Sequence, residues 1–437
     1  MSLASEFEQT IRCYRLPALE TLLQDEEFIL PYYGGYSIAN LAQTIVSLFG
    51  KEKEGALIRA GLEPALPSSA WEHLAGNVCA VVVVILDALG YLGFKRLLEQ
   101  EETGFSRLAE MGTLVPLTSV FPSTTMAAMS SIWTGRTPAD HGFLGRRLFL
   151  PEYGFLADMI RLMPAIHGQP GSLMQWGWEP EAFIPVPHLA QLLSEAGVRT
   201  VAHLYGPHVG GGLSRLFLRG VERIEGFLNY SDMWINLRDT VMSRTETPLL
   251  ASAYWAGTDD VAHRYGPADE RLAALVLQIA QSFEQDFHGA LPAAAREGTV
   301  VIITADHGQV ETPPERAVYL QEHPELKEML LWPPSAEPRA SYLHVRPGCT
   351  GQVRDYVATR LADQFRVLEM DEAIAAGLFG LGEMPRESRA RLGDLLLLAR
   401  DNSRLIPEGV SAADLGEHGS LLPEEMLVPL LMGRLDV

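Results

Sequence analysis

A run of consecutive β-branched residues constrains the fold of this chain more than any other feature. Residues 81–86 read VVVVIL and are followed directly by Asp87. A strand that is apolar on both faces must be buried on both faces, which is typical of a parallel sheet covered by helices. Residues 299–305, TVVIITA, repeat the pattern and lead into Asp306 and His307. The two runs predict a deeply buried parallel sheet.

Further strand-like runs alternate with helical patterns, which is typical of helices packed on both faces of such a sheet. We expect strands within residues 113–121, 198–206 and 248–257, and a long amphipathic helix over 270–291. The predicted fold class is α/β, a three-layer α/β/α sandwich with a mostly parallel central sheet and a small α+β insertion.

The expected organisation of the 437 residues has four parts. Residues 1–76 form an N-terminal helical segment packed on the core, and residues 77–330 form the α/β core that carries the site. A small α+β insertion follows over 331–395, and residues 396–437 return to the core. Residues 144–186 are rich in Pro, Gly, Trp and Met, break the rhythm of strands and helices, and suggest a loop or lid beside the site.

The charge of the chain excludes some classes of partner. Lys and Arg total 34 and Asp and Glu total 55, so the formal net charge is −21. Nucleic-acid polymers and anionic membranes are bound through clustered cations, so neither is expected as a partner. A small anionic substrate is still compatible with the charge, because bound metal ions can reverse the sign of one pocket.

The cysteines and the apolar runs bear on location. Cys13, Cys79 and Cys349 form no CxxC pair, which excludes a disulfide scaffold and a thiolate zinc module and fits a reducing compartment. Residues 1–15 contain no apolar segment typical of a secretory signal. The longest apolar run, 79–86, is too short to span a bilayer. We therefore predict a cytoplasmic protein, and the oligomeric state is left open.

Three of the predicted strands end at acidic residues, Asp87, Asp259 and Asp306. Ligands of open parallel sheets bind outside the carboxyl ends of the strands, so these carboxylates are expected to converge on one edge. Each of them alone is better interpreted as a helix N-cap or a turn residue. Because histidines accompany them, the set favours a metal site.

Two local pairs strengthen this hypothesis. Asp259 and His263 lie four positions apart, so one helical turn or a compact loop can direct both at one ion; the alternative is a capped helix with a surface histidine. Asp306 and His307 can face the same way only on a loop, and Gly308 permits such a turn. Carboxylate and imidazole together suit zinc or manganese.

The segment Phe121-Pro122-Ser123-Thr124-Thr125 precedes a helical pattern. A hydroxyl at a helix N-terminus lies near free backbone N–H groups and the positive end of the helix dipole, which suits a phosphoryl group. A plain helix cap is the alternative for this segment. A metal ion nearby would instead lower the pKa of the hydroxyl and make it a nucleophile.

Taken together and in order, the motifs resemble those of the alkaline phosphatase superfamily, and within it the type I phosphodiesterase/nucleotide pyrophosphatase family. The resemblance covers roughly residues 78–310 and 400–437. The motifs that carry it are Asp87 after its buried strand, FPSTT at 121–125, TGRTPADHG at 134–142, DDVAHRYGP at 259–267, ADHG at 305–308 and GEHG at 416–419.

This resemblance implies an alkaline phosphatase-like fold and two divalent metal ions, zinc first and manganese as the alternative. It implies a phospho-threonine intermediate on Thr125, the third residue after Pro122. The implied ligands of the first ion are Asp87, Thr125, Asp306 and His307, and those of the second are Asp259, His263 and His418.

The expected function is metal-dependent hydrolysis of a small phosphorylated substrate. Phosphodiester or nucleotide pyrophosphate bonds are the preferred prediction for the bonds that are cleaved. Met126 to Ala128 replace the aromatic-Pro-Asn of nucleotide-hydrolysing members, and Gly145-Arg146-Arg147 replaces a phosphate-contacting Asn. Arg146 and Arg147 are therefore candidate substrate-binding residues, or else surface arginines. The alternatives for the protein are a phosphomonoesterase, a phosphomutase, or a member that binds metal without turnover.

Overall fold

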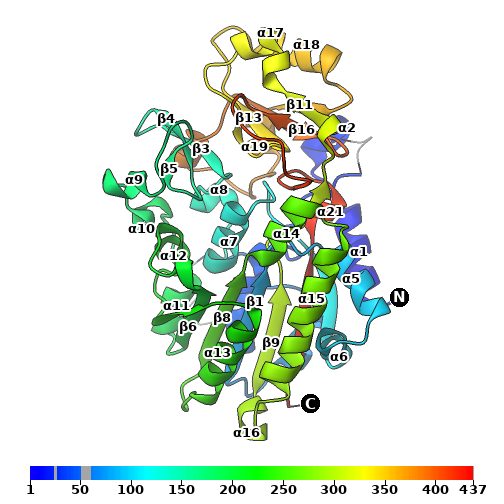
Figure 1. Cartoon of the computed structure of the whole chain (residues 1–437), viewed down its shortest axis with the longest axis vertical. Helices are drawn as coiled ribbons and strands as arrows, with labels where there is room; N and C mark the ends of the chain where they lie inside the picture. The colour runs from blue at the N-terminus through cyan, green and yellow to red at the C-terminus, as the bar shows by residue number, and fades with distance from the viewer. Residues whose placement is uncertain (24–26, 51–60, 437) are drawn as a thin grey trace.

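The computed structural model describes residues 1–23, 27–50 and 61–436. Seven strands form the central sheet, in the order β2-β18-β9-β1-β8-β6-β7 (Figure 1). The five strands from β9 to β7 are parallel, whereas β18 runs antiparallel to both β9 and β2. The strands span Thr113–Thr118 (β2), Leu427–Arg434 (β18), Thr299–Thr304 (β9), Ala80–Leu86 (β1), Leu249–Trp255 (β8), Arg199–Tyr205 (β6) and Arg223–Phe227 (β7).

The predicted parallel sheet is thus confirmed, and β1 lies at its centre between β8 and β9. Val83 lies opposite Ser252 on one side and Ile302 on the other. Every residue of β1 and of β9 is buried. These two strands are parallel and lie side by side, so the residues that directly follow them lie together at the carboxyl edge of the sheet.

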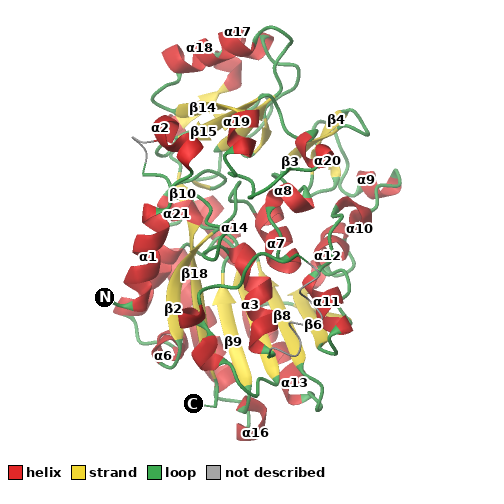
Figure 2. Cartoon of the chain, turned by 180° about the vertical axis from the view of Figure 1, so that it is seen from behind, coloured by secondary structure: helices red, strands yellow, loops and turns green. Residues whose placement is uncertain are grey.

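Helices cover both faces of this sheet, which gives the predicted three layers. Figure 1 shows α13 (Tyr230–Met242) and α15 (Glu270–Ser282) in front of the sheet. From behind, Figure 2 shows α3 (Leu41–Leu48) over the other face. The remaining helices of the core are α1 (Leu3–Cys13), α5 (Tyr91–Gln100), α6 (Gly104–Glu110), α7 (Thr125–Thr134), α11 (Leu189–Glu195), α12 (Gly212–Phe217), α14 (Gly257–Tyr265), α16 (Ala293–Arg296) and α21 (Pro423–Met426). The short helix α2 (Glu20–Leu23) lies beside the strands at the other end of the molecule, near β14 (Phe365–Glu369) and β16 (Arg404–Ile406) (Figures 1 and 2).

A second sheet lies beyond the carboxyl ends of the parallel strands (Figure 1). Its seven strands are antiparallel and follow the order β14-β15-β13-β12-β3-β4-β5. They span Phe365–Glu369 (β14), Leu395–Ala399 (β15), Ala340–Leu343 (β13), Ser335–Ala336 (β12), Arg147–Leu150 (β3), Phe155–Asp158 (β4) and Met163–Pro164 (β5).

The surroundings of this second sheet include several short elements. The helices are α8 (Pro138–His141), α9 (Ser172–Gln175), α10 (Pro180–Phe183), α17 (Pro324–Glu328), α18 (Thr350–Arg360), α19 (Met370–Ala375) and α20 (Arg386–Arg389). Two short pairs, β10 (Val310–Glu311) with β17 (Gly416–Glu417) and β11 (Ala317–Tyr319) with β16 (Arg404–Ile406), connect this region to the core.

The second sheet extends past the boundaries predicted for the insertion at 331–395. Strands β3 to β5 come from 147–164, inside the segment read as a loop or lid, and they pair with β12 through Arg147 and Ala336. The apolar run at 395–399 was expected to return to the core, but as β15 it pairs with β13 and β14. The four-part division of the chain stays a prediction, and β18 is the strand of its last part that joins the central sheet.

A buried ion pair joins the two sheets. Arg339, between β12 and β13, donates to both carboxylate oxygens of Glu425 in α21, at 3.0 and 2.9 Å. Neither side chain is exposed to solvent. The Arg339 guanidinium also donates to the Ser403 carbonyl oxygen at 2.7 Å, so several of its donors are satisfied within the protein.

We expect Arg339→Met to lower the free energy of unfolding by about 3–5 kcal/mol, because it leaves the Glu425 carboxylate buried without a counter-charge. Chemical denaturation followed by circular dichroism measures this loss. Arg316→Met is the matched control, since the ion pair of Arg316 with Asp401 is solvent-exposed and spans 3.4 Å; exposed pairs contribute at most about 1 kcal/mol. Equal losses in the two variants would contradict the prediction.

Candidate metal centre

The carboxyl ends of β1 and β9 bring together the first predicted group of ligands. One ligand atom from each of Asp87, Asp306 and His307 lies within 4.8 Å of the others, and all three residues are buried. The His307 Nε2 atom is 3.5 Å from Asp87 Oδ1 and 3.5 Å from Asp306 Oδ2. Thr125 Oγ1 lies 3.2 Å from the same Nε2 atom. The four residues predicted for the first ion therefore converge.

The loop after β9 turns at Gly308, as the sequence predicted. A Cβ atom on Gly308 would lie 2.0 Å from the Glu424 carbonyl oxygen, so only glycine fits there. Asp306 Oδ1 accepts hydrogen bonds from the backbone N–H groups of His307 at 3.0 Å and Ala88 at 3.1 Å. These contacts fix one carboxylate oxygen and direct the other, Oδ2, towards His307.

The second predicted group assembles from α14 and a loop near the C-terminus. Ligand atoms of Asp259, His263 and His418 lie within 4.8 Å of one another. His263 Nε2 is 3.3 Å from Asp259 Oδ1, as the spacing of one helical turn predicted. The His418 ring stacks on the His307 ring with 3.9 Å between centroids. The two groups are therefore immediate neighbours.

The three histidines share one orientation. Each Nδ1 atom lies within hydrogen-bonding distance of a backbone carbonyl oxygen, so Nδ1 carries the proton and Nε2 keeps its lone pair for a ligand. The three distances are 3.0 Å from His307 to Gly308, 2.7 Å from His263 to Gly416 and 2.8 Å from His418 to Ser123.

The carboxylates carry oxygens that the protein itself does not satisfy. Among the described residues, Asp87 Oδ1 and Asp306 Oδ2 are buried and have no hydrogen-bond partner. Burial raises the pKa of Asp87 well above its ordinary value, and the charges of Asp306 and Asp259 raise this pKa further. Orphaned anionic oxygens beside an imidazole lone pair form a donor set suited to a divalent cation, so the residues present fit the expected metals.

The electrostatics also favour neutral imidazole at His418. Burial lowers the pKa of His418 well below its ordinary value, and the nearby His307 and His263 lower it further. Only a neutral imidazole can bind a metal ion. For His263, burial opposes protonation, but the charges of Asp259 and Glu417 outweigh burial and raise its pKa.

Thr125 is the first residue of α7, and Thr124 occupies the N-cap position without capping the helix through its side chain. The Thr124 hydroxyl instead donates to Glu337 Oε1 at 2.7 Å. The first N–H groups of α7 are thus left without a side-chain acceptor from the cap residue. A helix start of this kind attracts anions, and it places the Thr125 hydroxyl where a phosphoryl group would bind.

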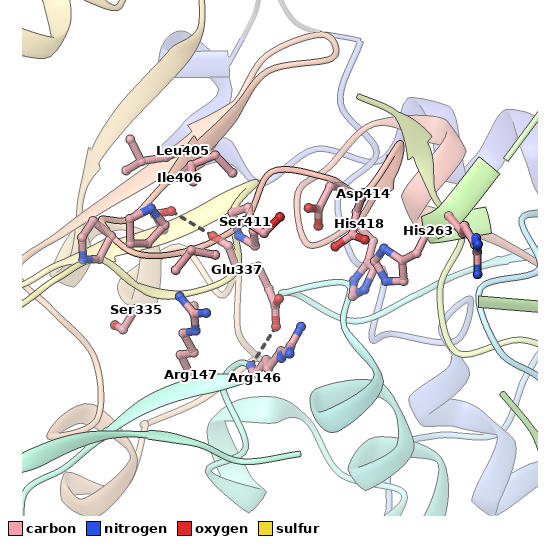
Figure 3. Close-up of a pocket in the computed structure, with 18 of the residues that line it drawn as sticks. Arg146, Arg147, His263, Ser335, Glu337, Leu405, Ile406, Ser411, Asp414 and His418 are labelled. Atoms are coloured by element: carbon pink, nitrogen blue, oxygen red, sulfur yellow. Dashed lines mark hydrogen bonds between the residues drawn. The ribbon is translucent and has the colours of Figure 1, made fainter. Parts of the chain in front are cut away.

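A cavity of about 290 Å³ opens beside the second group of ligands (Figure 3). Its walls include His263 and His418, together with both candidate substrate-binding residues, Arg146 and Arg147. The backbone N–H of Arg146 donates to Glu337 Oε1 at 2.7 Å, and its guanidinium lies 3.5 Å from Asp158. The segments at 144–186 and 331–395 both contribute to this cavity.

Two residues that hydrogen-bond to the ligand groups, and a third that contacts the neighbouring Thr124, were not found from the sequence. Tyr254 donates a hydrogen bond to Asp87 Oδ2, and Gln309 donates one to Asp259 Oδ1. Glu337 contacts Thr124 as described above. Tyr254 lies in a strand and Glu337 lies between short strands of the second sheet, so neither shows a spacing relative to its partner that a sequence pattern reveals.

With the site assembled, comparison with known proteins becomes informative. A model of the type I phosphodiesterase/nucleotide pyrophosphatase family matches residues 81–421. The chain belongs to this family. It is therefore a hydrolase of the phosphodiesterase/pyrophosphatase type, and the predicted membership is confirmed. No curated protein sequence matches the chain.

Solved structures of the same fold include murine ectonucleotide pyrophosphatase/phosphodiesterase 5. It shares 17% sequence identity at a TM-score of 0.58, over 80% of this chain and 87% of that one. Phosphonoacetate hydrolase from Sinorhizobium meliloti, solved with phosphonoacetate, shares 18% identity at a TM-score of 0.59, over 82% of this chain and 90% of that one. These likenesses confirm the alkaline phosphatase-like fold.

The described helices include none with both the length and the apolar content that crossing a bilayer requires. The predicted cytoplasmic location stays a prediction.

We expect Tyr254→Phe to weaken Zn²⁺ binding about 10- to 100-fold, because outer hydrogen bonds orient metal-ligating groups and their loss typically costs this much affinity. Titration against a chromophoric chelator measures the dissociation constant. Tyr91→Phe is the matched control, since the Tyr91 hydroxyl is also buried but has no partner among the described residues. Similar zinc affinity in Tyr254→Phe and the control would contradict a role for this hydrogen bond.

Proposed function

We propose that the protein hydrolyses phosphodiester or nucleotide pyrophosphate bonds of small substrates with two divalent metal ions and a phospho-threonine intermediate. The observation that carries this proposal is the convergence of two ligand groups on Thr125 at the start of α7. Thr125 Oγ1 lies 3.2 Å from His307 Nε2, beside carboxylate oxygens that have no partner within the described chain.

Asp87, Thr125, Asp306 and His307 would hold one ion, and Asp259, His263 and His418 the other. When bound, two such ions polarise phosphoryl oxygens and stabilise the charges of the attacking and leaving groups. Zinc is the first choice because oxygen and imidazole nitrogen ligands suit it, and manganese is the alternative. The orientation of the three histidines, each with Nε2 directed at its group, supports this assignment.

The chain's own residues would then carry out the transfer. Thr125 Oγ1 loses its hydroxyl proton to solvent, attacks phosphorus and forms a P–O bond, while the bond between phosphorus and the leaving-group oxygen breaks and that oxygen takes up a proton from solvent. The N–H groups at the start of α7 face the phosphoryl oxygens and stabilise their charge. Water then breaks the P–Oγ1 bond and restores the hydroxyl. In support, an inactive threonine-to-alanine variant of murine ectonucleotide pyrophosphatase/phosphodiesterase 5 has been solved in complex with AMP.

Phosphomonoester hydrolysis is the second candidate. Arg146 and Arg147 line the cavity beside the ligand groups, and extra positive charge there favours a more highly charged phosphate. The ratio of kcat/KM for bis(4-nitrophenyl) phosphate to kcat/KM for 4-nitrophenyl phosphate separates the two candidates, and a ratio above one supports the diester.

We expect Thr125→Ala to reduce kcat on bis(4-nitrophenyl) phosphate by about 10³-fold or more, because the variant has no nucleophile. Thr125→Ser restores a hydroxyl and should recover part of the activity. Thr359→Ala is the matched control, since the exposed Thr359 hydroxyl bonds only to carbonyl oxygens within its own helix. Undiminished activity in Thr125→Ala would overturn the phospho-threonine intermediate.

Metal content tests the ligand sets independently of activity. The purified chain should contain about two equivalents of metal, and His418→Ala about one, by elemental analysis. Zinc at about 100 times its dissociation constant should stabilise the metal-free protein by about 2.7 kcal/mol, seen as a higher unfolding temperature. One equivalent in the unmodified chain, or two in His418→Ala, would contradict the assignment.

A further inference from the structure

Arg147 occupies a defined position in the wall of the cavity. It is the first residue of β3, where its backbone pairs with Asp158 of β4 and Ala336 of β12. Its half-buried side chain lines the cavity. Figure 3 shows the guanidinium directed into the cavity, on the side away from His263. The strand pairing on both sides holds the backbone of Arg147 in place.

The guanidinium of Arg147 has no hydrogen bond or ion pair within the described chain. Of the other two arginines that line the cavity, Arg146 lies 3.5 Å from Asp158, and Arg264 is solvent-exposed. Burial and the charge of Arg146 lower the pKa of Arg147, whereas the charges of Asp158, Glu337 and Glu417 act in the opposite direction. A half-buried cation whose donors lack acceptors is costly unless a bound ligand supplies an anion.

The shape of the cavity limits what a ligand can bring there. Since His263 and His418 line it, an ester with its phosphoryl group at Thr125 would extend its leaving group into this space. A volume of about 290 Å³ admits only a small group. None of the described residues that line the cavity is Phe, Tyr or Trp, so no aromatic ring is available to stack on a nucleobase.

Charges are distributed unevenly around the cavity. Asp260 and Asp414 lie in the wall together with His263 and His418, and Figure 3 shows Asp414 beside His418. Glu337 already accepts hydrogen bonds from the Thr124 hydroxyl and the Arg146 backbone. Arg264 and Glu417 also line the cavity, so the His263 side carries charges of both signs. A second anionic group of a ligand would be attracted to the wall that carries Arg147, because the donors of this guanidinium have no acceptor within the described chain.

We propose that Arg147 forms an anion subsite, which selects phosphate esters whose leaving group carries a second anionic group on a short aliphatic arm. This inference rests on the proposed function, because the subsite is defined relative to a phosphoryl group bound at Thr125. The second anion is a carboxylate or another phosphoryl group, since both accept paired hydrogen bonds from a guanidinium.

Competitive inhibition by three matched phosphonates tests the subsite in the metal-loaded, full-length protein. Propylphosphonate ends in a methyl group, 3-phosphonopropionate replaces that methyl with a carboxylate, and ethane-1,2-bisphosphonate replaces it with a second phosphonate. The inhibition constants are measured with bis(4-nitrophenyl) phosphate as substrate and with metal in excess. For at least one of the two compounds that carry a second anionic group, the inhibition constant should be at least about tenfold lower than for propylphosphonate. The tighter of the two identifies the preferred anion.

Substitution of Arg147 must remove this advantage specifically. In Arg147→Met the two anionic compounds should lose their roughly tenfold gain, while the inhibition constant of propylphosphonate stays within about twofold. Arg147→Lys keeps the charge and should retain part of the gain. Arg199→Met is the matched control, because Arg199 pairs with Glu222 at 3.1 Å at the solvent-accessible start of β6. Circular dichroism establishes that each variant is folded.

The outcomes separate the two proposals. Equal binding of all three phosphonates to the unmodified protein, or an advantage that survives in Arg147→Met, overturns the subsite. Absent turnover with intact zinc binding overturns the proposed function instead. Calorimetric titration of the same phosphonates into the zinc-loaded protein then still measures how much more tightly the two anionic compounds bind than propylphosphonate. The subsite is therefore tested in either case.

Discussion

The structure depends on the close approach of three carboxylates, two buried and one half-buried, at one edge of a parallel sheet. Asp87, Asp259 and Asp306 lie so close that their charges oppose one another, and burial raises the pKa of Asp87 and Asp259. Among the described residues, neither Asp87 Oδ1 nor Asp306 Oδ2 has a hydrogen-bond donor, and the His307 Nε2 atom lies 3.5 Å from each of them. Such an arrangement is stable when divalent cations supply the missing charge, so the folding of this edge and the binding of metal are linked.

The second sheet is part of this arrangement because it holds the loops that complete the site. Glu425 receives both the Arg339 guanidinium and the Ser420 backbone N–H, and its carbonyl oxygen accepts a hydrogen bond from Gly308 at 2.9 Å. One residue thus connects the second sheet, the loop after His418 and the turn after His307. The positions of two histidines from different parts of the chain therefore depend on a single buried ion pair.

A site residue or strand could be predicted from the sequence where a local pattern determines its position, and could not where a contact between distant residues determines it. Buried strands place Asp87 and Asp306 by continuity, and the helical period places His263 next to Asp259. His418 followed only from the resemblance to a family, because no local period links it to the rest. Strands β3 to β5 were missed because they are short and lie in a segment rich in Pro, Gly, Trp and Met. They pair with one another, and β3 joins the rest of the second sheet through a distant residue, Ala336 of β12. The run at 395–399 is equally apolar in either sheet, so composition alone cannot assign it.

A protein with a net charge of −21 can bind an anionic substrate because most of its acidic residues are too far from the cavity to repel it. Salt screens exposed charges over about 8 Å at physiological ionic strength, so most of the acidic surface acts weakly on a molecule inside the cavity. What acts there is the nearby set of charges: the ligand carboxylates, which bound metal would neutralise, Glu337, which accepts hydrogen bonds from Thr124 and Arg146, and Arg147. The acidic surface instead disfavours polyanions too large to enter, so the overall charge and the local charge select for small substrates together.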